Sequence, residues 1–256
     1  MRLTFAGTSD VGRKRTHNED AYLLLPEESL CCVADGMGGH ASGEVASRIA
    51  VEEMAEFFRM TGRDDDATWP FKMDAARSYD DNRLLTGVKL ANLRIFERAA
   101  TDQRLRGMGT TLVAASFPKG GRTMLVGHVG DSRAYLFRRG TLRQLTEDHS
   151  LLNDYRKSRA LTPEEIEAFP HKNVIVRALG MKDTVEVDLM REELEDGDVL
   201  LLCSDGLSGM VPDPRMTDLL RANVGDLRHA SQALVDAANE AGGGDNVTCV
   251  LAQVRV

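Results

Sequence analysis

The sequence predicts an α+β domain in which antiparallel strands and helices form separate layers. Short apolar runs of strand length follow one another, with hairpin signals at Lys119-Gly120-Gly121 and Arg139-Gly140. Longer segments carry apolar residues at helical spacing, in one group early in the chain and another near its end. No linker is long enough to divide the 256 residues, so we expect one domain over residues 1–256.

The N-terminal part of the chain alternates between strand and helix patterns. Strands are expected at residues 3–9, 21–25 and 30–34, and helices at 43–59 and 84–99. The stretch 61–81 is polar, carries three consecutive aspartates and is interrupted by Trp69-Pro70. We interpret it as a variable, poorly packed or disordered loop whose aspartates form a solvated surface rather than a metal site.

The C-terminal part begins with a strand-rich region and ends with helices before a last strand. Strands are expected at residues 110–117, 123–129, 134–137, 142–145, 185–190, 199–203 and 247–254, and helices at 215–222 and 226–241. Segment 146–180 interrupts the strands: it is polar, with Thr162 as a helix cap and Pro163 in the first turn. It is therefore expected to be a small helical excursion from the sheet.

Charge and cysteine content exclude several classes of function. The formal net charge of −8 argues against general binding to nucleic acid or to an anionic membrane. An enzyme acting on phosphate would therefore need local positive charge, most simply from metal ions. The four cysteines lie inside strand-like runs without zinc spacing, and neither a signal peptide nor a membrane span is evident. We expect a cytoplasmic protein.

Four aspartates occur where a strand-like run ends or begins. Asp35, Asp131 and Asp205 each follow an apolar run, and Asp245 shortly precedes one. In an antiparallel sheet one strand's end lies beside its neighbour's beginning, so these carboxylates can converge at one edge of the core. One Asp-Gly after a strand is usually only a turn, but the repeated setting predicts a metal site built from carboxylates.

Eight short motifs occur in a fixed order along residues 9–248. They are Ser9-Asp10-Val11-Gly12 with Arg15 and Asn18-Glu19-Asp20, Val33-Ala34-Asp35-Gly36-Met37-Gly38-Gly39-His40, Gly109-Thr110-Thr111, Val129-Gly130-Asp131-Ser132-Arg133, Asp148-His149-Ser150, Asn173-Val174 with Arg177-Ala178-Leu179-Gly180, Ser204-Asp205-Gly206-Leu207, and Asp245-Asn246-Val247-Thr248. In this order the chain resembles the bacterial metal-dependent protein phosphatases of the PPM type, also called protein phosphatase 2C. Eight motifs in register over nearly the full chain are highly specific.

The resemblance implies a four-layer αββα sandwich, with two antiparallel sheets between helical layers and Mn²⁺ or Mg²⁺ in a cleft at one edge. It implies that Asp35 bridges two cations and that the Gly36 carbonyl binds one of them. Asp205 and Asp245 would complete the other cation's ligands, so the three aspartates are the expected catalytic residues.

Further roles are implied around this pair. Asp20 and Glu19 would support the two cations directly or through water, and Asp131 matches the aspartate of a third cation site. Arg15 matches the arginine that binds the substrate phosphate. Segment 146–180 corresponds to the family's flap. The implied reaction is hydrolysis of phosphoserine and phosphothreonine on proteins without a covalent intermediate, reversing a bacterial Ser/Thr kinase on its targets.

Elementary chemistry agrees with these assignments. Two cations bridged by one carboxylate lower the pKa of a bound water and neutralise charge that develops on a departing phosphoryl group. Oxygen ligands suit Mg²⁺ or Mn²⁺, and no His/Cys cluster in the sequence indicates zinc. At Arg15 a planar guanidinium can bind two phosphate oxygens, which a lysine cannot do.

The general acid is not assigned by the sequence. Animal members of the family carry a histidine directly after the Asp-Gly, where this chain has Met37, as bacterial members commonly do. A metal-bound water and His40 are the two candidates. His128 lies inside a strand-like run and is expected to be structural, and His17 has no assigned role.

Two other functions remain open from the sequence. An inactive scaffold that keeps the fold would have lost its metal carboxylates, yet Asp35, Asp205 and Asp245 are present. Hydrolysis of a different phosphoester is compatible with the same site, because the metals contact only the phosphate. No Cys-x5-Arg loop indicates a cysteine-nucleophile phosphatase. The expected partners are phosphorylated proteins rather than nucleic acid or membrane, and a monomer is the default.

Overall fold

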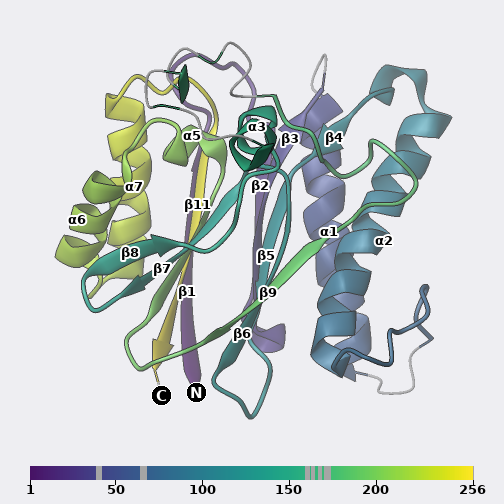
Figure 1. The fold of residues 1–256 in the computed structure, drawn as a ribbon, viewed down its shortest axis with the longest axis horizontal. Helices are drawn as coiled ribbons and strands as arrows, with labels where there is room; N and C mark the ends of the chain where they lie inside the picture. The colour runs from purple at the N-terminus through teal and green to yellow at the C-terminus, as the bar shows by residue number, and fades with distance from the viewer. Residues whose placement is uncertain are drawn as a thin grey trace.

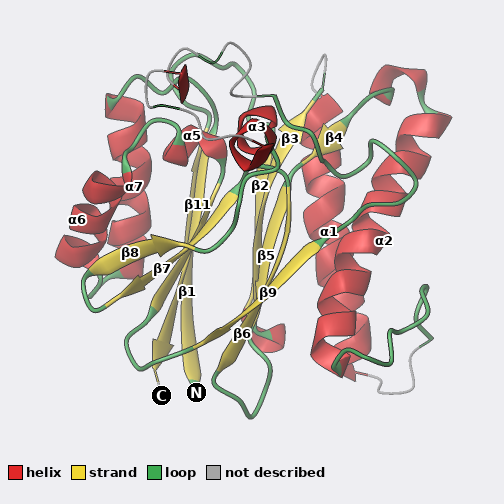
Figure 2. Ribbon diagram, viewed as in Figure 1, coloured by secondary structure: helices red, strands yellow, loops and turns green. Residues whose placement is uncertain are grey.

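Two antiparallel sheets face each other, and a helical layer covers the outer face of each (Figure 1). The computed structural model describes residues 1–38, 42–63, 68–158, 162, 165, 166, 169 and 174–255. In Figure 2 the strands of the two sheets stand between α6 and α7 on one side and α1 and α2 on the other. This is the four-layer αββα arrangement that the family resemblance implied.

The first sheet joins the two ends of the chain. Its order is β1 (Arg2–Asp10), β11 (Val247–Arg255), β10 (Val199–Cys203), β7 (Arg133–Arg138) and β8 (Thr141–Gln144). The predicted hairpin at Arg139-Gly140 connects β7 to β8, and both residues have positive φ, 51° and 81°. Such backbone is typical of a tight two-residue hairpin turn.

The second sheet carries the central motif. Its order is β2 (Asp20–Leu25), β3 (Leu30–Met37), β5 (Leu112–Ser116), β6 (Thr123–Val129) and β9 (Asp188–Glu193), and β4 (Gly109–Thr110) pairs with β3. The expectation that the third strand ends at Asp35 was wrong, because Gly36 and Met37 still pair with Thr110 and Gly109.

Two other strand boundaries differ from the predictions. The single strand expected at 110–117 is divided into β4 and β5, because Thr111 is committed to Asp35: its N–H donates to the Asp35 carbonyl (2.9 Å). The strand expected at 185–190 forms instead as β9, and all six of its residues, Asp188–Glu193, pair with β6.

The long helices lie where the apolar periodicity predicted them. They are α1 (Ser42–Arg63), α2 (Tyr79–Thr101), α6 (Asp213–Asn223) and α7 (Leu227–Glu240). Shorter helical elements are η1 (Pro26–Glu28), η2 (Gln103–Leu105), α3 (Leu151–Ser158) and α5 (Asp205–Ser208). Helix α5, a single turn that begins at Asp205 directly after Ser204, was not predicted.

Apolar side chains fill three layers. Buried residues of α1 and α2, such as Phe57 and Ile95, pack on the outer face of the second sheet. Leu220 and Leu234 of α6 and α7 pack on the outer face of the first sheet. Val33 and Val250 belong to the layer between the sheets. This burial fixes the register of both sheets, because a one-residue slip would turn every core side chain outward.

Part of segment 61–81 is better packed than expected. Helix α1 continues to Arg63, and the Trp69 ring lies edge-on to Phe57 and Tyr79, with ring centroids 5.5 and 5.2 Å away. The aromatic contact attaches this stretch to the helical layer, so the prediction of a poorly packed loop was wrong at Trp69. The three consecutive aspartates, residues 64–66, lie outside the described residues.

The flap segment 146–180 is described in part. Helix α3 lies near the upper strand ends in Figure 1, and Ser150, directly before it, forms an isolated antiparallel bridge with Ile175. Thr162 Oγ1 accepts a hydrogen bond from the Glu165 N–H (3.2 Å), as expected of a helix cap, whereas Pro163 lies outside the described residues. Among the residues that are described, no helix combines the length and apolar character needed to cross a bilayer.

Candidate metal centre

The register of the second sheet brings two carboxylates together. Asp20 at the start of β2 lies opposite Asp35 in β3. The side chain of Asp20 is fixed further by Ser204, whose Oγ donates to Asp20 Oδ2 over 2.8 Å. Because Ser204 directly follows β10, this hydrogen bond joins the two sheets at the edge where the predicted site lies.

The other carboxylates reach the same edge from neighbouring strand ends. Asp205 follows β10, Asp245 precedes β11, and these two strands are adjacent in the first sheet. Burial raises the pKa of Asp35 well above its ordinary value. The negative charges of Asp20, Asp205, Asp131 and Asp245 raise that pKa further. The structure therefore groups five aspartates that are separated widely in the sequence.

The residues present fit divalent cations. Asp20 Oδ1 and Asp131 Oδ1 are buried and have no hydrogen-bond partner. Burial raises the pKa of each of these two carboxyls to about 7, and neighbouring carboxylates contribute. Buried, like-charged oxygens without partners are costly unless a cation neutralises them. An all-oxygen donor set of this kind suits Mg²⁺ or Mn²⁺.

Gly36 and Glu19 support the cluster through the backbone. The Gly36 N–H donates to the Glu19 carbonyl (3.1 Å), and an ideal Cβ on Gly36 would lie 2.2 Å from the Gly43 carbonyl oxygen. Only glycine fits at this crossing of β3 and α1. Glu19 Oε1 accepts from the Gly43 N–H (3.2 Å), which places its carboxylate at the start of α1.

Arg15 lies at the mouth of the cluster, as expected for a residue that binds a phosphate. Its Nη2 donates to Asp245 Oδ2 over 2.7 Å, and about half of its side chain is exposed. This hydrogen bond and the negative charges of Asp245, Glu19 and Asp35 raise the pKa of Arg15. The guanidinium therefore remains charged beside the carboxylates while part of it faces solvent.

Asn246 supports the loop beside the cluster, a role that was not predicted from the sequence. Its Oδ1 accepts from the Glu19 N–H (2.8 Å), and its Nδ2 donates to the carbonyls of Val11 and His17 (2.9 Å each). These bonds hold the loop that carries Arg15 and Glu19 against the start of β11. An asparagine directly after an aspartate of the predicted metal site was the sequence feature that could have indicated this role.

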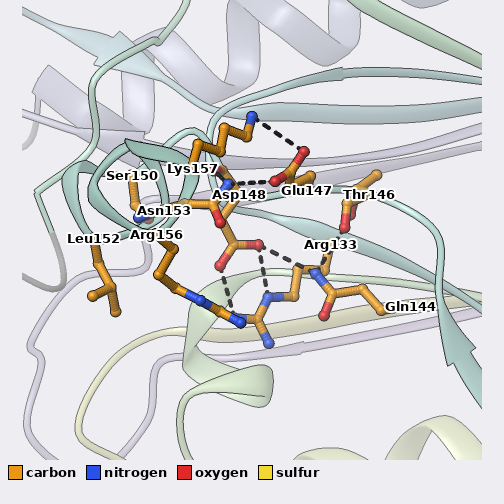
Figure 3. A pocket seen from close by; sticks show the side chains of 10 residues that line it. All are labelled: Arg133, Gln144, Thr146, Glu147, Asp148, Ser150, Leu152, Asn153, Arg156 and Lys157. Carbon is orange, nitrogen blue, oxygen red and sulfur yellow. Dashed lines mark hydrogen bonds and ion pairs between the residues drawn. The ribbon is translucent and has the colours of Figure 1, made fainter. Parts of the chain in front are cut away.

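Two cavities open along this edge. One of about 540 Å³ is lined by Asp131, Asp205 and Asp245. A second, of about 490 Å³, extends it beneath α3 and shares Arg133 and Asp148 with it. Figure 3 shows the Arg133 guanidinium donating to both carboxylate oxygens of Asp148, over 2.8 and 2.7 Å. This ion pair therefore lines both cavities.

The structure describes His128 but not His40. His128 is buried (3% exposed) and hydrogen-bonded to backbone, which agrees with a structural role. His40 and Asn173 lie outside the described residues, so the general acid stays unassigned.

Comparison with known proteins decides the family. The family model described as protein phosphatase 2C matches residues 7–240. The chain belongs to the protein phosphatase 2C family. It is 37% identical over 252 residues to the serine/threonine phosphatase stp of Listeria welshimeri, covering 96% of this chain and 93% of that protein.

Solved structures of this family agree. The Mycobacterium tuberculosis serine/threonine phosphatase PstP/Ppp superimposes with a TM-score of 0.84 at 35% identity, covering 100% of both chains. The catalytic domain of PstP in complex with two manganese ions gives 0.81 at 36% identity and 99% of both chains. The present protein is accordingly a metal-dependent serine/threonine protein phosphatase, which confirms the predicted fold class and function.

Proposed function

We propose that the grouped carboxylates hold two Mn²⁺ or Mg²⁺ ions, with Asp35 as the bridge. Gly36 would supply its carbonyl, and Asp205 and Asp245 would complete the ligand set. Asp20 and Glu19 would support the pair, and Asp131 would hold a third cation. The supporting observation is that Asp20 Oδ1 and Asp131 Oδ1 are buried without partners in a cluster of like charges.

The reaction follows from what these residues can do. Bound cations would supply a water of lowered pKa and neutralise charge on the phosphoryl group. Arg15, held by Asp245 and half exposed, is positioned to bind two oxygens of an incoming phosphate. The buried aspartates keep the cluster negative enough to retain cations while the mouth of the cavity stays open to substrate. No side chain is assigned as the general acid.

Phosphoserine and phosphothreonine on proteins are the proposed substrates, including the targets of a bacterial Ser/Thr kinase and that kinase itself. The cavity beneath α3 gives a polypeptide chain room beside the cation site, which a small phosphoester would not need. We propose one catalytic domain over residues 1–256 with a flap at 146–180, acting as a monomer. The cytoplasm is the proposed location, since all four cysteines are buried and free.

The test is metal-dependent hydrolysis of para-nitrophenyl phosphate and of a phosphothreonine peptide, each with Mn²⁺, with Mg²⁺ and with EDTA. Asp35→Asn and Asp205→Asn are expected to abolish turnover. Asp218→Asn, at an exposed carboxylate on α6, is the matched control and should behave as wild type. Hydrolysis of the small ester without the peptide would favour another phosphoester. A folded wild type that is inactive with both metals would favour the scaffold function.

A further inference from the structure

Two buried histidines lie next to the proposed third cation site. His128 in β6 and His149 in segment 146–180 are 3% and 6% exposed, and their ring centroids are 4.4 Å apart. Neither histidine lines the cavity formed by Asp131, Asp205 and Asp245. Both, however, bond to Gly130, the residue directly before Asp131. We call this arrangement the histidine clamp.

The clamp binds both backbone polar groups of Gly130, and so holds the peptide units on either side of this residue. The Gly130 N–H donates to His149 Nδ1 (3.0 Å), and the Gly130 carbonyl accepts from His128 Nε2 (2.8 Å) and from the His149 N–H (2.8 Å). Gly130 has φ +110°, and a Cβ there would lie 2.6 Å from the Thr111 side chain. The chain therefore leaves β6 through a conformation that needs glycine and is fixed by imidazoles.

The hydrogen bonds determine where the imidazole protons lie. The Gly130 N–H can only donate, so His149 Nδ1 is unprotonated, and its neutral ring carries the proton on Nε2. That nitrogen lies 3.2 Å from Asp188 Oδ2. The Gly130 carbonyl can only accept, so His128 carries its proton on Nε2. Burial lowers the pKa of both histidines, to about 4 for His128, which agrees with neutral rings.

Arg177 makes the same cluster unsuitable for a metal ion. His128, His149 and Asp188 could place three ligand atoms within 4.8 Å of one another. Arg177 Nη1, however, lies 2.6 Å from Asp188 Oδ1 and 3.2 Å from His149 Nε2. A guanidinium already neutralises this carboxylate, and His149 Nδ1 is committed to Gly130. The cluster is therefore built to orient the His149 ring.

This arrangement fixes the backbone directly before Asp131. The Asp131 side chain is 8% exposed, and its Oδ1 is buried without a partner. It lies beyond the end of β6 at Val129, so no strand register fixes it. We propose that His128 and His149 are positioning residues that hold the Asp131 carboxylate in place for a third cation, with Asp188, itself held by Arg177, orienting His149. The inference rests on the proposed assignment of Asp131.

The test compares two substitutions of His149 in the full chain by calorimetric Mn²⁺ titration. In His149→Asn the side-chain Oδ1 stands where Nδ1 was and still accepts from Gly130, whereas His149→Leu removes the acceptor. We expect His149→Leu to lower the Mn²⁺ affinity of the weakest class of sites by about 10- to 100-fold. This is the usual effect of losing a residue that orients a ligand. His149→Asn should stay within about threefold of wild type by the same reasoning.

Asp131→Asn serves as the reference, since it should abolish that same class of sites. The tighter Mn²⁺ classes should be unchanged in all three variants, so failure of this inference is distinguishable from failure of the proposed binuclear site. Equal weakening by both His149 variants, or none by His149→Leu, would overturn the proposal. A wild-type titration that shows no weaker class of Mn²⁺ sites would overturn it as well.

A milder variant covers the case in which His149→Leu does not fold. Asp188 is 53% exposed, so Asp188→Ala should leave the fold intact while removing the partner of His149 Nε2. It should weaken the same class of Mn²⁺ sites by about three- to tenfold, less than the loss of the ring. An unchanged titration would show that Asp188 does not orient His149 and would remove that part of the proposal.

Discussion

The proposed centre joins two kinds of carboxylate. Asp20 and Asp35 lie opposite each other in paired strands, so the register that buries the core also sets their separation. Asp131 follows a strand end and is held by side chains that bond to the preceding glycine. The comparison teaches that sheet register sets the spacing of strand ligands directly, whereas a loop ligand depends on side chains that hold its backbone.

The largest effect should come from the strand ligand at the centre. Asp35→Asn is expected to lower phosphopeptide turnover by at least about 10³-fold, because the bridging charge is lost. The same change should stabilise the metal-free protein by about 1 kcal/mol or more, since it removes a carboxylate whose pKa is raised by burial and by four neighbouring carboxylates. Turnover assays and urea unfolding in EDTA measure the two effects. A metal-free variant less stable than wild type would contradict the charge argument.

A second substitution perturbs the backbone directly after Asp205. Gly206 follows Asp205, and an added Cβ would lie 1.9 Å from the Asn246 carbonyl oxygen. Gly206→Ala should therefore cost about 3 kcal/mol or more and abolish tight Mn²⁺ binding, because β10 and β11 must separate. Gly225→Ala is the control, since no atom lies within 4 Å of its added Cβ. Equal urea midpoints for the two variants would show that this contact does not position the ligands.

Arg15 separates substrate binding from cation binding. Arg15→Gln should lower kcat/KM for a phosphothreonine peptide by about 10- to 100-fold, the value of a charged hydrogen bond to phosphate. Mn²⁺ affinity should stay the same or rise, because the guanidinium that competes for Asp245 is gone. Steady-state kinetics and Mn²⁺ titration distinguish the two effects. A parallel loss of Mn²⁺ affinity would instead place Arg15 in the structure of the centre.

Three ligands were predictable because strand patterns end or begin at or near them and the pairing rule brings those strand ends to one edge. The motif order that resembles the family then gave Asp35, Asp205 and Asp245 their expected roles, and the structure groups them. The support of Asp131 was not predictable. His149 lies in a polar segment without periodicity, and its contact with Gly130 depends on a turn with positive φ. Trp69 was missed because a lone aromatic residue in a polar stretch carries no period.

The smallest expected effect compares the two kinds of carboxylate by pH. In the metal-free protein the pKa values of Asp20 and Asp131 are both raised to about 7. A raised carboxyl pKa means that the folded state binds the proton more tightly than the unfolded one. Stability from these groups is therefore complete below about pH 4 and is lost as pH rises through 7.

Asp20 and Asp131 should contribute unequally to that loss. The melting temperature in EDTA should fall by about 5 °C or more between pH 5 and pH 8. Asp20→Asn should remove more of this fall than Asp131→Asn, because Asp20 lies opposite Asp35 and its charge also raises the pKa of that carboxyl. Mn²⁺ should reduce the fall in wild type. A larger effect of Asp131→Asn would contradict this argument from the pairing of Asp20 with Asp35.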